Sequence, residues 1–206
     1  MPRISKEREA AVRARILDAG IRAFERDGFR RASMNGIATA VGLSSGAIYT
    51  YFDSKEDLFL QAFATLVQDE EERLTRAVAA ESTTRAKARL AVDFFVDVAV
   101  APSSDGMRGV GGGFLVHAWA HSDESPQIRR QLLYRRQQFT SLVRSIVEEA
   151  VARGELPAAT DTAGLSGAIG SMFDGLLVQR AEAGEAFGRE DARRQADALI
   201  GALLRD

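Results

Sequence analysis

Apolar residues recur with the spacing of an α-helix along almost the whole chain, and no segment shows the alternation typical of a β-strand. Glycine, proline and acidic turn residues separate these segments. The predicted helices cover residues 6–27, 34–41, 45–52, 54–80, 84–101, 112–122, 126–154, 161–184 and 189–204. We therefore expect an all-α fold of about nine helices, with a small three-helix domain at 1–53 and a larger helical domain at 54–206.

The segment from Ser33 to Leu58 has the most specific pattern. Its first helix has one apolar face at positions i, i+3, i+4 and i+7, formed by Met34, Ile37, Ala38 and Val41. Ser33 is placed to cap the start of this helix, Gly42 to end it, and Ser44 to cap a second short helix. A helix, a turn containing glycine and a second helix form the helix-turn-helix pattern of DNA-binding proteins.

The second helix of this pair leaves a polar, acid-free surface. Ile48 and Phe52 lie one turn apart and are expected to face inward. The residues left at the surface or its margins are Ser45, Gly46, Ala47, Tyr49, Thr50 and Tyr51. Small residues permit close entry into the major groove, and hydroxyl groups can bind bases or phosphates. The alternative is an ordinary surface helix with two partly buried tyrosines.

Lys55 favours the DNA-binding interpretation. Ser54 and Asp57 fit a capping box at the start of the next helix, which places Lys55 in its first turn. The helix dipole disfavours a cation there, so the lysine suggests an external anion such as a DNA phosphate. The neighbouring acids Glu56 and Asp57 partly offset its charge.

Three ordered segments carry a family resemblance: ILDAGIRAFERDGF at 16–29, SMNGIATAVGLSSGAIYTYF at 33–52 and DSKEDLF at 53–59. Together they resemble the DNA-binding domain of the tetracycline-repressor (TetR) family of bacterial transcription regulators. The resemblance implies phosphate contacts by Ser33, Tyr49, Tyr51 and Lys55, and base contacts by Ser45, Gly46, Ala47 and Thr50. The full set of candidate DNA-binding residues is Ser33, Ser44, Ser45, Gly46, Ala47, Tyr49, Thr50, Tyr51 and Lys55.

The chain departs from the family pattern at one point. Asn35 and Gly36 stand where the family usually has charged or polar residues before its Ile-Ala pair. A glycine inside a helix costs roughly 1 kcal/mol relative to alanine. The departure weakens the local helix prediction and leaves the motif in place.

Charge is divided unevenly along the chain. The net charge is −2, but residues 1–52 hold nine basic and five acidic residues, whereas the remainder holds 18 basic and 24 acidic. The basic half contains the helix-turn-helix. Basic residues at the start of the chain are candidates for a flexible arm that reaches phosphates: Arg3, Lys6, Arg8, Arg13 and Arg15. The alternative is an ordinary solvated terminus.

Composition limits the other classes of protein. The chain has no cysteine, which excludes disulfides and thiolate metal sites. No apolar run approaches the roughly 20 residues that span a bilayer, and MPRISKEREA lacks the apolar core of a signal peptide. We therefore expect a cytoplasmic protein without a membrane partner. An enzyme is disfavoured, because no Ser-His-Asp or paired-carboxylate spacing stands out, and no cofactor is expected.

The larger domain is expected to hold a ligand pocket, because helical bundles form cavities between facing helices and the resemblance implies an effector-binding domain. The candidate lining residues are Phe95, Phe114, His117, Trp119, Tyr134, Gln138, Met172 and Phe173. The alternative is that these residues are plain core. Apolar walls favour an apolar or amphipathic effector.

Two other motifs have a chemical and a structural interpretation. His117 and His121 stand at i, i+4 and can share a helix face, but only Asp123 or Glu124 is near enough to complete a metal site. A metal-responsive regulator is therefore a minor alternative. The glycine run at 109–113 lacks the lysine and Ser/Thr of a phosphate-binding loop, so a hinge or loop is favoured.

The last two helices have broad apolar faces that can serve both the core and a partner. The candidate interface residues are Leu165, Ile169, Leu176, Leu199 and Leu203. The resemblance implies that these two helices form a four-helix dimer interface. The sequence thus predicts a homodimeric repressor that binds a near-palindromic DNA operator and is released by a small-molecule effector. The main alternative is a related regulator that has no effector and works through protein partners.

Overall fold

The computed structural model describes residues 6–100 and 112–203, apart from the side chains of 67–71, 112, 202 and 203. Within this part the chain forms nine α-helices and one 3-10 helix, with no strand. In order they are α1 (Lys6–Arg31), α2 (Met34–Ala40), α3 (Ser45–Ile48), α4 (Lys55–Ala80), α5 (Thr84–Val100), α6 (Gly112–His121), α7 (Pro126–Ala152), α8 (Thr162–Ala183), η1 (Gly184–Ala186) and α9 (Arg189–Leu203). The predicted all-α fold is confirmed.

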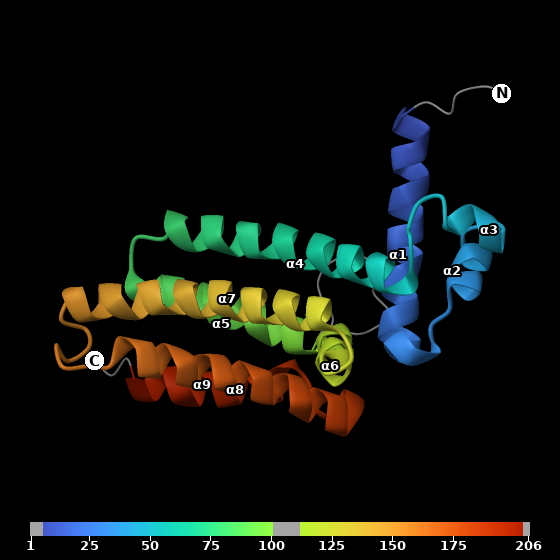
Figure 1. Cartoon of the computed structure of the whole chain (residues 1–206). Coiled ribbons are helices and arrows are strands. Elements are labelled where there is room, and N and C mark those ends of the chain that lie inside the picture. Colours follow the sequence, from blue (N-terminus) through green and yellow to red (C-terminus); the bar gives the residue numbers. More distant parts are fainter. Residues whose placement is uncertain (1–5, 101–111, 204–206) are drawn as a thin grey trace.

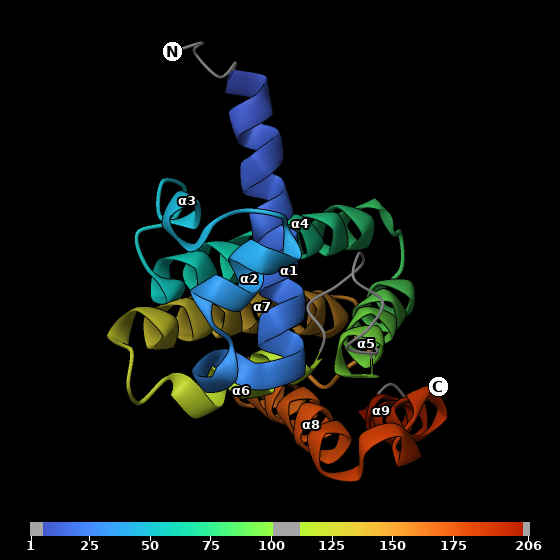
Figure 2. The ribbon, with the colours of Figure 1, turned by 90° about the vertical axis from the view of Figure 1, so that its right-hand side faces the viewer.

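The long helices form three layers, with the small N-terminal helices at one end (Figure 1). The first layer is α4, the second contains α5 and α7, and the third contains α8 and α9. Helix α1 stands across the end of this bundle and carries α2 and α3 on its outer side (Figures 1 and 2). Helix α6 fills the end of the bundle and packs directly against α1. In the described part of the chain, no helix has both the length and the apolar character needed to cross a membrane.

The helix-turn-helix forms where the sequence predicted it. The apolar face predicted for α2 is buried at all four positions, Met34, Ile37, Ala38 and Val41, and Ile48 and Phe52 are buried too. Gly42 has a positive φ of 72°, a conformation that glycine adopts without strain. Helix α3 is shorter than predicted, however, because it ends at Ile48 and continues as hydrogen-bonded turns. The Thr50 N–H donates to the Ala47 carbonyl, and this tighter path lets Phe52 reach the core.

Helix α1 is interrupted where the sequence predicted its end. The backbone of Gly28 leaves the helical region, with φ 72° and ψ 164°, and a further turn runs to Arg31. This break turns Phe29 back toward the bundle, where its ring packs 5.3 Å from that of Phe59. The predicted glycine loop lies partly outside the described residues, and its last two glycines begin α6.

Aromatic rings join the small domain to the bundle. Phe24 of α1 packs edge-on against Phe59 of α4 at 5.0 Å, and Phe114 of α6 stacks on Phe59 at 4.7 Å. All three rings are fully buried. Burying a phenylalanine contributes roughly 1.5–3 kcal/mol, so this cluster fixes α1, α4 and α6 to one another.

Candidate nucleic-acid interface and internal pocket

Serine side chains cap the helices of the DNA-binding unit. The hydroxyl oxygen of Ser33 accepts from the Gly36 N–H at 3.1 Å, and that of Ser44 accepts from the Ala47 N–H at 3.2 Å. Both predicted caps are confirmed. Each hydroxyl keeps its own proton available for donation. Both serines are exposed, so these protons are accessible to an acceptor from outside the protein.

The outer surface of α3 is open and uncharged. Tyr49 is 50 % exposed, and Ser45, Gly46 and Thr50 are also exposed. A Cβ atom at Gly46 would meet no other atom within 4 Å, so the glycine leaves the helix backbone open to an approaching partner. No acidic residue occurs between positions 33 and 52. The surface therefore presents nothing that would repel phosphate, and the DNA contacts of these residues stay a prediction.

Lys55 has partners within the protein. Its ammonium donates to the backbone carbonyls of Phe29 at 2.7 Å, Ala32 at 3.0 Å and Arg30 at 3.3 Å. It also lies 4.5 Å from the centre of the Phe29 ring. Burial lowers the pKa of Lys55 from its ordinary value. These carbonyls explain why a cation occupies the first turn of α4, so the lysine requires no external anion. A phosphate contact by Lys55 stays a prediction.

The predicted flexible basic arm is corrected, because Lys6, Arg8, Arg13 and Arg15 all lie in helix α1. Arg13 donates to the Tyr51 carbonyl at 2.6 Å, and Arg15 donates to the Val41 carbonyl at 2.8 Å. Both side chains therefore hold the helix-turn-helix against α1. The sequence did not reveal this because their partners lie 38 and 26 residues away. Arg3 lies outside the described residues.

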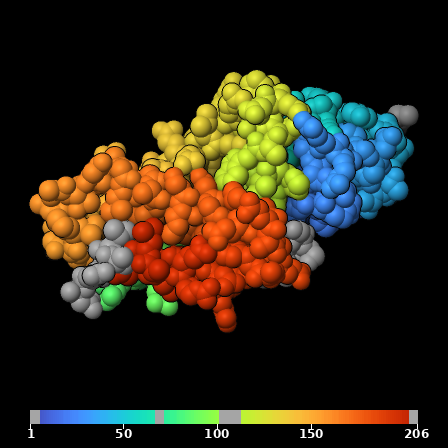
Figure 3. Space-filling model, turned by 90° about the horizontal axis from the view of Figure 1, so that it is seen from below, coloured from blue at the N-terminus to red at the C-terminus, as the bar shows by residue number. Residues whose placement is uncertain are grey.

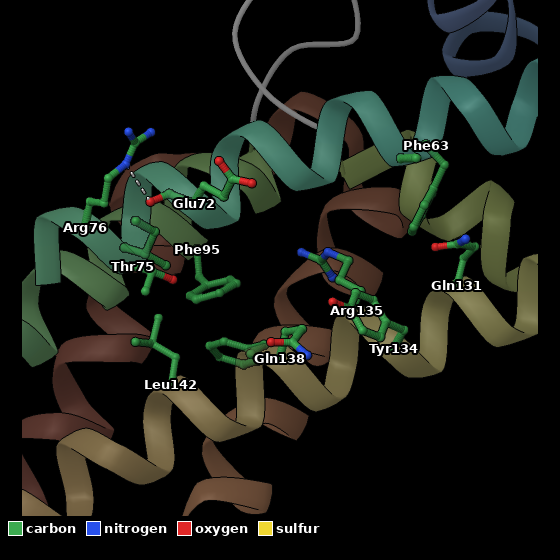
Figure 4. A pocket seen from close by; sticks show the side chains of 13 residues that line it. Phe63, Glu72, Thr75, Arg76, Phe95, Gln131, Tyr134, Arg135, Gln138 and Leu142 are labelled. Carbon is green, nitrogen blue, oxygen red and sulfur yellow. Dashed lines mark hydrogen bonds between the residues drawn. The ribbon is translucent and has the colours of Figure 1, made fainter. Parts of the chain in front are cut away.

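A cavity of about 500 Å³ lies between α4, α5 and α7 (Figure 4). It is lined by Phe63, Ala64, Glu72, Leu74, Thr75, Arg76, Phe95, Gln131, Tyr134, Arg135, Gln138, Phe139 and Leu142. Figure 4 shows Phe95 and Arg135 pointing into the space between α4 and α7, whereas Arg76 points away from it. This size and mixture of aromatic and polar walls suit a small organic molecule.

The structure brings only part of the predicted pocket together. Phe95, Tyr134 and Gln138 line the cavity. Phe173 packs behind it, with its ring 4.8 Å from that of Phe95, and Trp119 borders a separate hollow of about 210 Å³ between α6, α7 and α8. Met172 is half-buried on α8 and is not among the residues that line the cavity.

The sequence analysis missed the wall that α4 contributes, including Phe63 and Leu74. Phe114, which was predicted to line the pocket, belongs instead to the aromatic cluster at α1. The hydrophobic pattern identified the apolar face of each helix, but it did not show which helices face each other across a gap. The length of α4 was the sequence feature that could have indicated this wall, because the helix extends far beyond the DNA-binding unit.

The two histidines lie against α1 and do not line the cavity. The His121 ring stacks on Phe29 with 4.1 Å between ring centres, and a Cβ atom at Gly28 would lie 3.0 Å from Nδ1 of His117. Burial lowers the pKa of both imidazoles. Nearby Arg31 adds to this effect at His117, and Arg30 adds to it at His121.

Each of the two acids near the histidines forms an ion pair with an arginine, and the partner of Glu124 is Arg30. Glu124 Oε2 lies 3.1 Å from Nδ1 of His121, and Asp123 forms an ion pair with Arg129 at 3.0 Å. Among the described residues, no group of three or more His, Cys, Asp or Glu side chains is arranged to hold a metal ion. The geometry therefore gives the metal-responsive alternative no support.

Helices α8 and α9 lie side by side on one face of the molecule (Figure 3). Two of the predicted interface residues, Ile169 and Leu176, are only 5 % and 0 % exposed and so belong to the core of the subunit. Leu165 and Leu199 are half-buried. The side chain of Leu203 lies outside the described residues. Val178 of α8 is 42 % exposed.

Comparison with known proteins adds independent observations. Residues 16–62 match the family model of bacterial regulatory proteins of the tetR family, and residues 113–205 match the C-terminal domain model of the BetI-type transcriptional repressor. The two matched regions together cover more than half of the chain.

Full-length relatives and solved structures agree with these matches. The HTH-type transcriptional regulator UidR of Escherichia coli is 29 % identical over 200 residues, covering 93 % of this chain and 92 % of the relative. The regulator TtgR of Pseudomonas putida is 27 % identical over 180 residues, covering 86 % and 83 %. A putative transcriptional regulator from Saccharomonospora viridis, solved in complex with choline, has a TM-score of 0.82 at 19 % identity and covers 93 % of this chain and 96 % of its own. These proteins are transcriptional regulators and not enzymes.

Proposed function

Because the chain belongs to the TetR family of bacterial regulatory proteins, we propose that it is a homodimeric repressor of transcription that responds to a small molecule. It binds a near-palindromic operator, and an effector in the cavity between α4, α5 and α7 releases it. Residues 1–53 form the DNA-binding domain, and residues 54–206 form the domain that binds the effector and the second subunit.

One observation carries this proposal: helix α4 belongs to both sites. It begins at Lys55, which contacts the end of α1, and its middle and last turns line the cavity through residues such as Phe63 and Leu74. A molecule that displaces α4 at the cavity therefore acts on the helix that supports the DNA-binding unit. The effector weakens DNA binding only to the extent that it favours the displaced arrangement.

The exposed surface of α3 provides the DNA contacts in this proposal. Ser45, Gly46, Ala47 and Thr50 face the base edges, and the capping serines with Tyr49 and Tyr51 bind phosphates. In a two-fold dimer, two such surfaces meet successive major grooves about 34 to 36 Å apart, or further apart on a stretched operator. The operator is then a near-palindrome.

The cavity supports an apolar or amphipathic effector. Aromatic and aliphatic side chains form most of its wall, while Gln131, Gln138 and Tyr134 supply polar groups that can orient a ligand. The similar regulator from Saccharomonospora viridis was solved with choline, which supports a small organic molecule as the class of ligand.

The first test is binding of the purified protein to a labelled DNA fragment from just upstream of its own reading frame, with excess non-specific DNA, at two salt concentrations. A sequence-specific regulator binds tightly, resists the competitor and loses affinity as salt rises. Small molecules are then screened for release of the DNA and for a rise in melting temperature. No hit in either screen would favour the alternative that has no effector and works through protein partners.

Replacing Tyr49 tests the assigned surface. Its side chain is half exposed and no hydrogen bond holds its phenol in the described structure, so Tyr49→Ala leaves the fold intact. We expect a loss of operator affinity of roughly tenfold, which corresponds to about 1.4 kcal/mol, with an unchanged dimer. Leu133→Ala, at a similarly exposed site on α7, is the matched control. Equal affinities for both variants would exclude Tyr49 from the interface.

A further inference from the structure

Arg13 connects three elements of the DNA-binding unit. From α1, its guanidinium donates to the carbonyl of Tyr51 at 2.6 Å and to the side-chain oxygen of Gln61 on α4. It also lies 4.5 Å from the centre of the buried Phe52 ring. The guanidinium therefore lies between the segment that follows α3 and the second turn of α4.

The contact continues as a chain of hydrogen bonds. The side-chain amide of Gln61 donates to Oδ1 of Asp57 at 2.6 Å, and Oδ2 of Asp57 accepts from the backbone N–H of Asp53 at 3.1 Å. The chain thus starts at the Tyr51 carbonyl, passes through Arg13, Gln61 and Asp57, and returns to the backbone two residues later. The connection between α3 and α4 is therefore held at two backbone positions, Tyr51 and Asp53.

This connection needs such support because α3 is short. Four residues of helix provide few hydrogen bonds of their own. Ile48 and Phe52 are the fully buried residues of the segment 45–52, and Tyr51 is partly buried against the core. The exposed residues Tyr49 and Thr50 lie on the turns between the two fully buried residues. Their direction therefore depends on where the Tyr51 backbone is held.

The chemistry of the contact requires a guanidinium. Its planar fork donates to a carbonyl and an amide oxygen at the same time while its face covers an aromatic ring. An ammonium carries the same charge but has neither the fork nor the flat face. A DNA phosphate, in contrast, accepts either cation.

We propose that Arg13 is a positioning residue for DNA recognition, which sets the direction of residues 49–52 by tying them to Gln61 of α4. It acts through Tyr51 and does not bind phosphate. This inference rests on the proposed DNA-binding function, and it adds that specificity depends on a residue outside the helix-turn-helix.

The conservative variant Arg13→Lys gives the sharpest test. We expect its affinity for the operator to fall roughly tenfold, which corresponds to about 1.4 kcal/mol, while its affinity for non-specific DNA and the salt dependence of binding stay at wild-type values. Gln61→Ala removes the partner and should give the same pattern. The double variant should lose little more than either single variant, because both break one chain.

Arg22→Gln is the charge control, because Arg22 is an exposed arginine of the same helix. It should leave the ratio of specific to non-specific affinity unchanged. A merely structural effect would lower the folded fraction without changing that ratio in the folded protein. If Arg13 binds phosphate, Arg13→Lys retains affinity, and Arg13→Gln weakens both kinds of binding and lowers the salt slope by about one. That result overturns the proposal.

Hydrogen exchange without DNA separates this inference from the proposed function. The amide of Asp53 and its neighbours at 51–54 should exchange faster in Arg13→Lys and Gln61→Ala than in the wild type, whether or not an operator is found. Unchanged exchange in both variants overturns the hydrogen-bonded chain. Faster exchange, together with a wild-type protein that binds no DNA specifically, would leave the chain intact and reject the regulator.

Discussion

Cations at helix ends hold the DNA-binding unit together at the scale of single residues. The last carbonyls of a helix have no partner within it and carry partial negative charge. Lys55 binds three such carbonyls at the end of α1, and Arg15 binds the carbonyl of Val41 at the end of α2. These contacts give a stabilising role to basic residues that the sequence alone assigned to DNA.

Replacing Lys55 separates the two roles. Lys55→Met keeps the length of the side chain but removes the donor from three carbonyls. A hydrogen bond to a charged group contributes roughly 1.5–3 kcal/mol to stability. We therefore expect Lys55→Met to lower the free energy of unfolding by about 2 kcal/mol. Urea unfolding of the protein without DNA measures it. Lys6→Met, at an exposed lysine of α1, is the control. If Lys55→Met weakens DNA binding but leaves the free energy of unfolding unchanged, then Lys55 contacts DNA and does not stabilise the fold.

The two partly buried histidines predict a dependence of stability on pH. Burial lowers the pKa of His117 and His121 below the ordinary value of 6.5. Below that value the unfolded chain binds protons that the folded protein does not, so stability is complete above about pH 6.5 and decreases as the pH falls toward the folded pKa values. These are the only histidines in the chain. Melting temperatures measured between about pH 7 and pH 5 follow this loss.

A variant with both histidines replaced, His117→Gln with His121→Gln, is the control for the pH series. Its melting temperature should be lower at neutral pH because the stacking on Phe29 is lost. Its slope with pH over the same interval should be smaller than that of the wild type. An identical slope would assign the pH dependence to other groups.

At the scale of elements, the sequence predicted the structural features that depend on residues close together along the chain. Helix α2, its cap at Ser33 and the turn at Gly42 were predicted correctly, because a cap, an apolar face and a left-handed glycine are all local features. The length of α3 was not predicted, because Tyr51 is held by Arg13, which lies 38 residues earlier. The pocket was predicted only in part for the same reason, since Phe63 and Phe95 line one cavity from two different helices.

The break in α1 provides a test of a single element. Gly28 has a φ of 72°, and a Cβ atom there would lie 3.0 Å from Nδ1 of His117. Gly28→Ala therefore has two costs. The first is backbone strain of about 1 to 3 kcal/mol, and the second is a tight contact between α1 and His117 of α6. We expect a fall in the free energy of unfolding, measured by urea unfolding.

Gly154 is a matched control for this variant. Its φ is 74°, but a Cβ atom there would meet nothing within 4 Å. Gly154→Ala therefore measures the cost of a Cβ atom at positive φ without a close neighbour. We expect Gly28→Ala to cost more, because Gly28 adds the contact with His117 and a ψ of 164°. Equal losses would mean that α6 does not restrict the end of α1.

For the whole molecule, the arrangement of layers decides how the two sites communicate. Phe63 lines the cavity, and its ring lies 6.0 Å from Phe114 of the cluster that joins α1, α4 and α6. The DNA-binding unit is thus packed against α4 and α6 together, and in the proposed mechanism it moves with them as one body. Effector response then depends on the second subunit, because a change in spacing between two units exists only in a dimer.

The dimer is the last prediction, and it concerns the face formed by α8 and α9. Val178 is 42 % exposed on α8, so Val178→Glu leaves the core of the subunit undisturbed. Burying an unpaired carboxylate between subunits costs several kcal/mol, and we expect the dissociation constant of the dimer to rise roughly a hundredfold. Light scattering during size exclusion would then report a mass near the 22.3 kDa of one chain. Operator binding should weaken in parallel, because each monomer reads one half-site.

Leu133→Glu is the control for this experiment, because Leu133 is an apolar residue of α7 that is 61 % exposed. Both variants add one negative charge at an exposed apolar site, so they differ only in the face that they change. A dimeric Leu133→Glu beside a monomeric Val178→Glu assigns the interface to α8 and α9. The reverse result assigns it to α7, and the two DNA-binding units would then be related by a different two-fold axis. A wild-type protein that is itself monomeric would reject the dimer, and with it the near-palindromic operator.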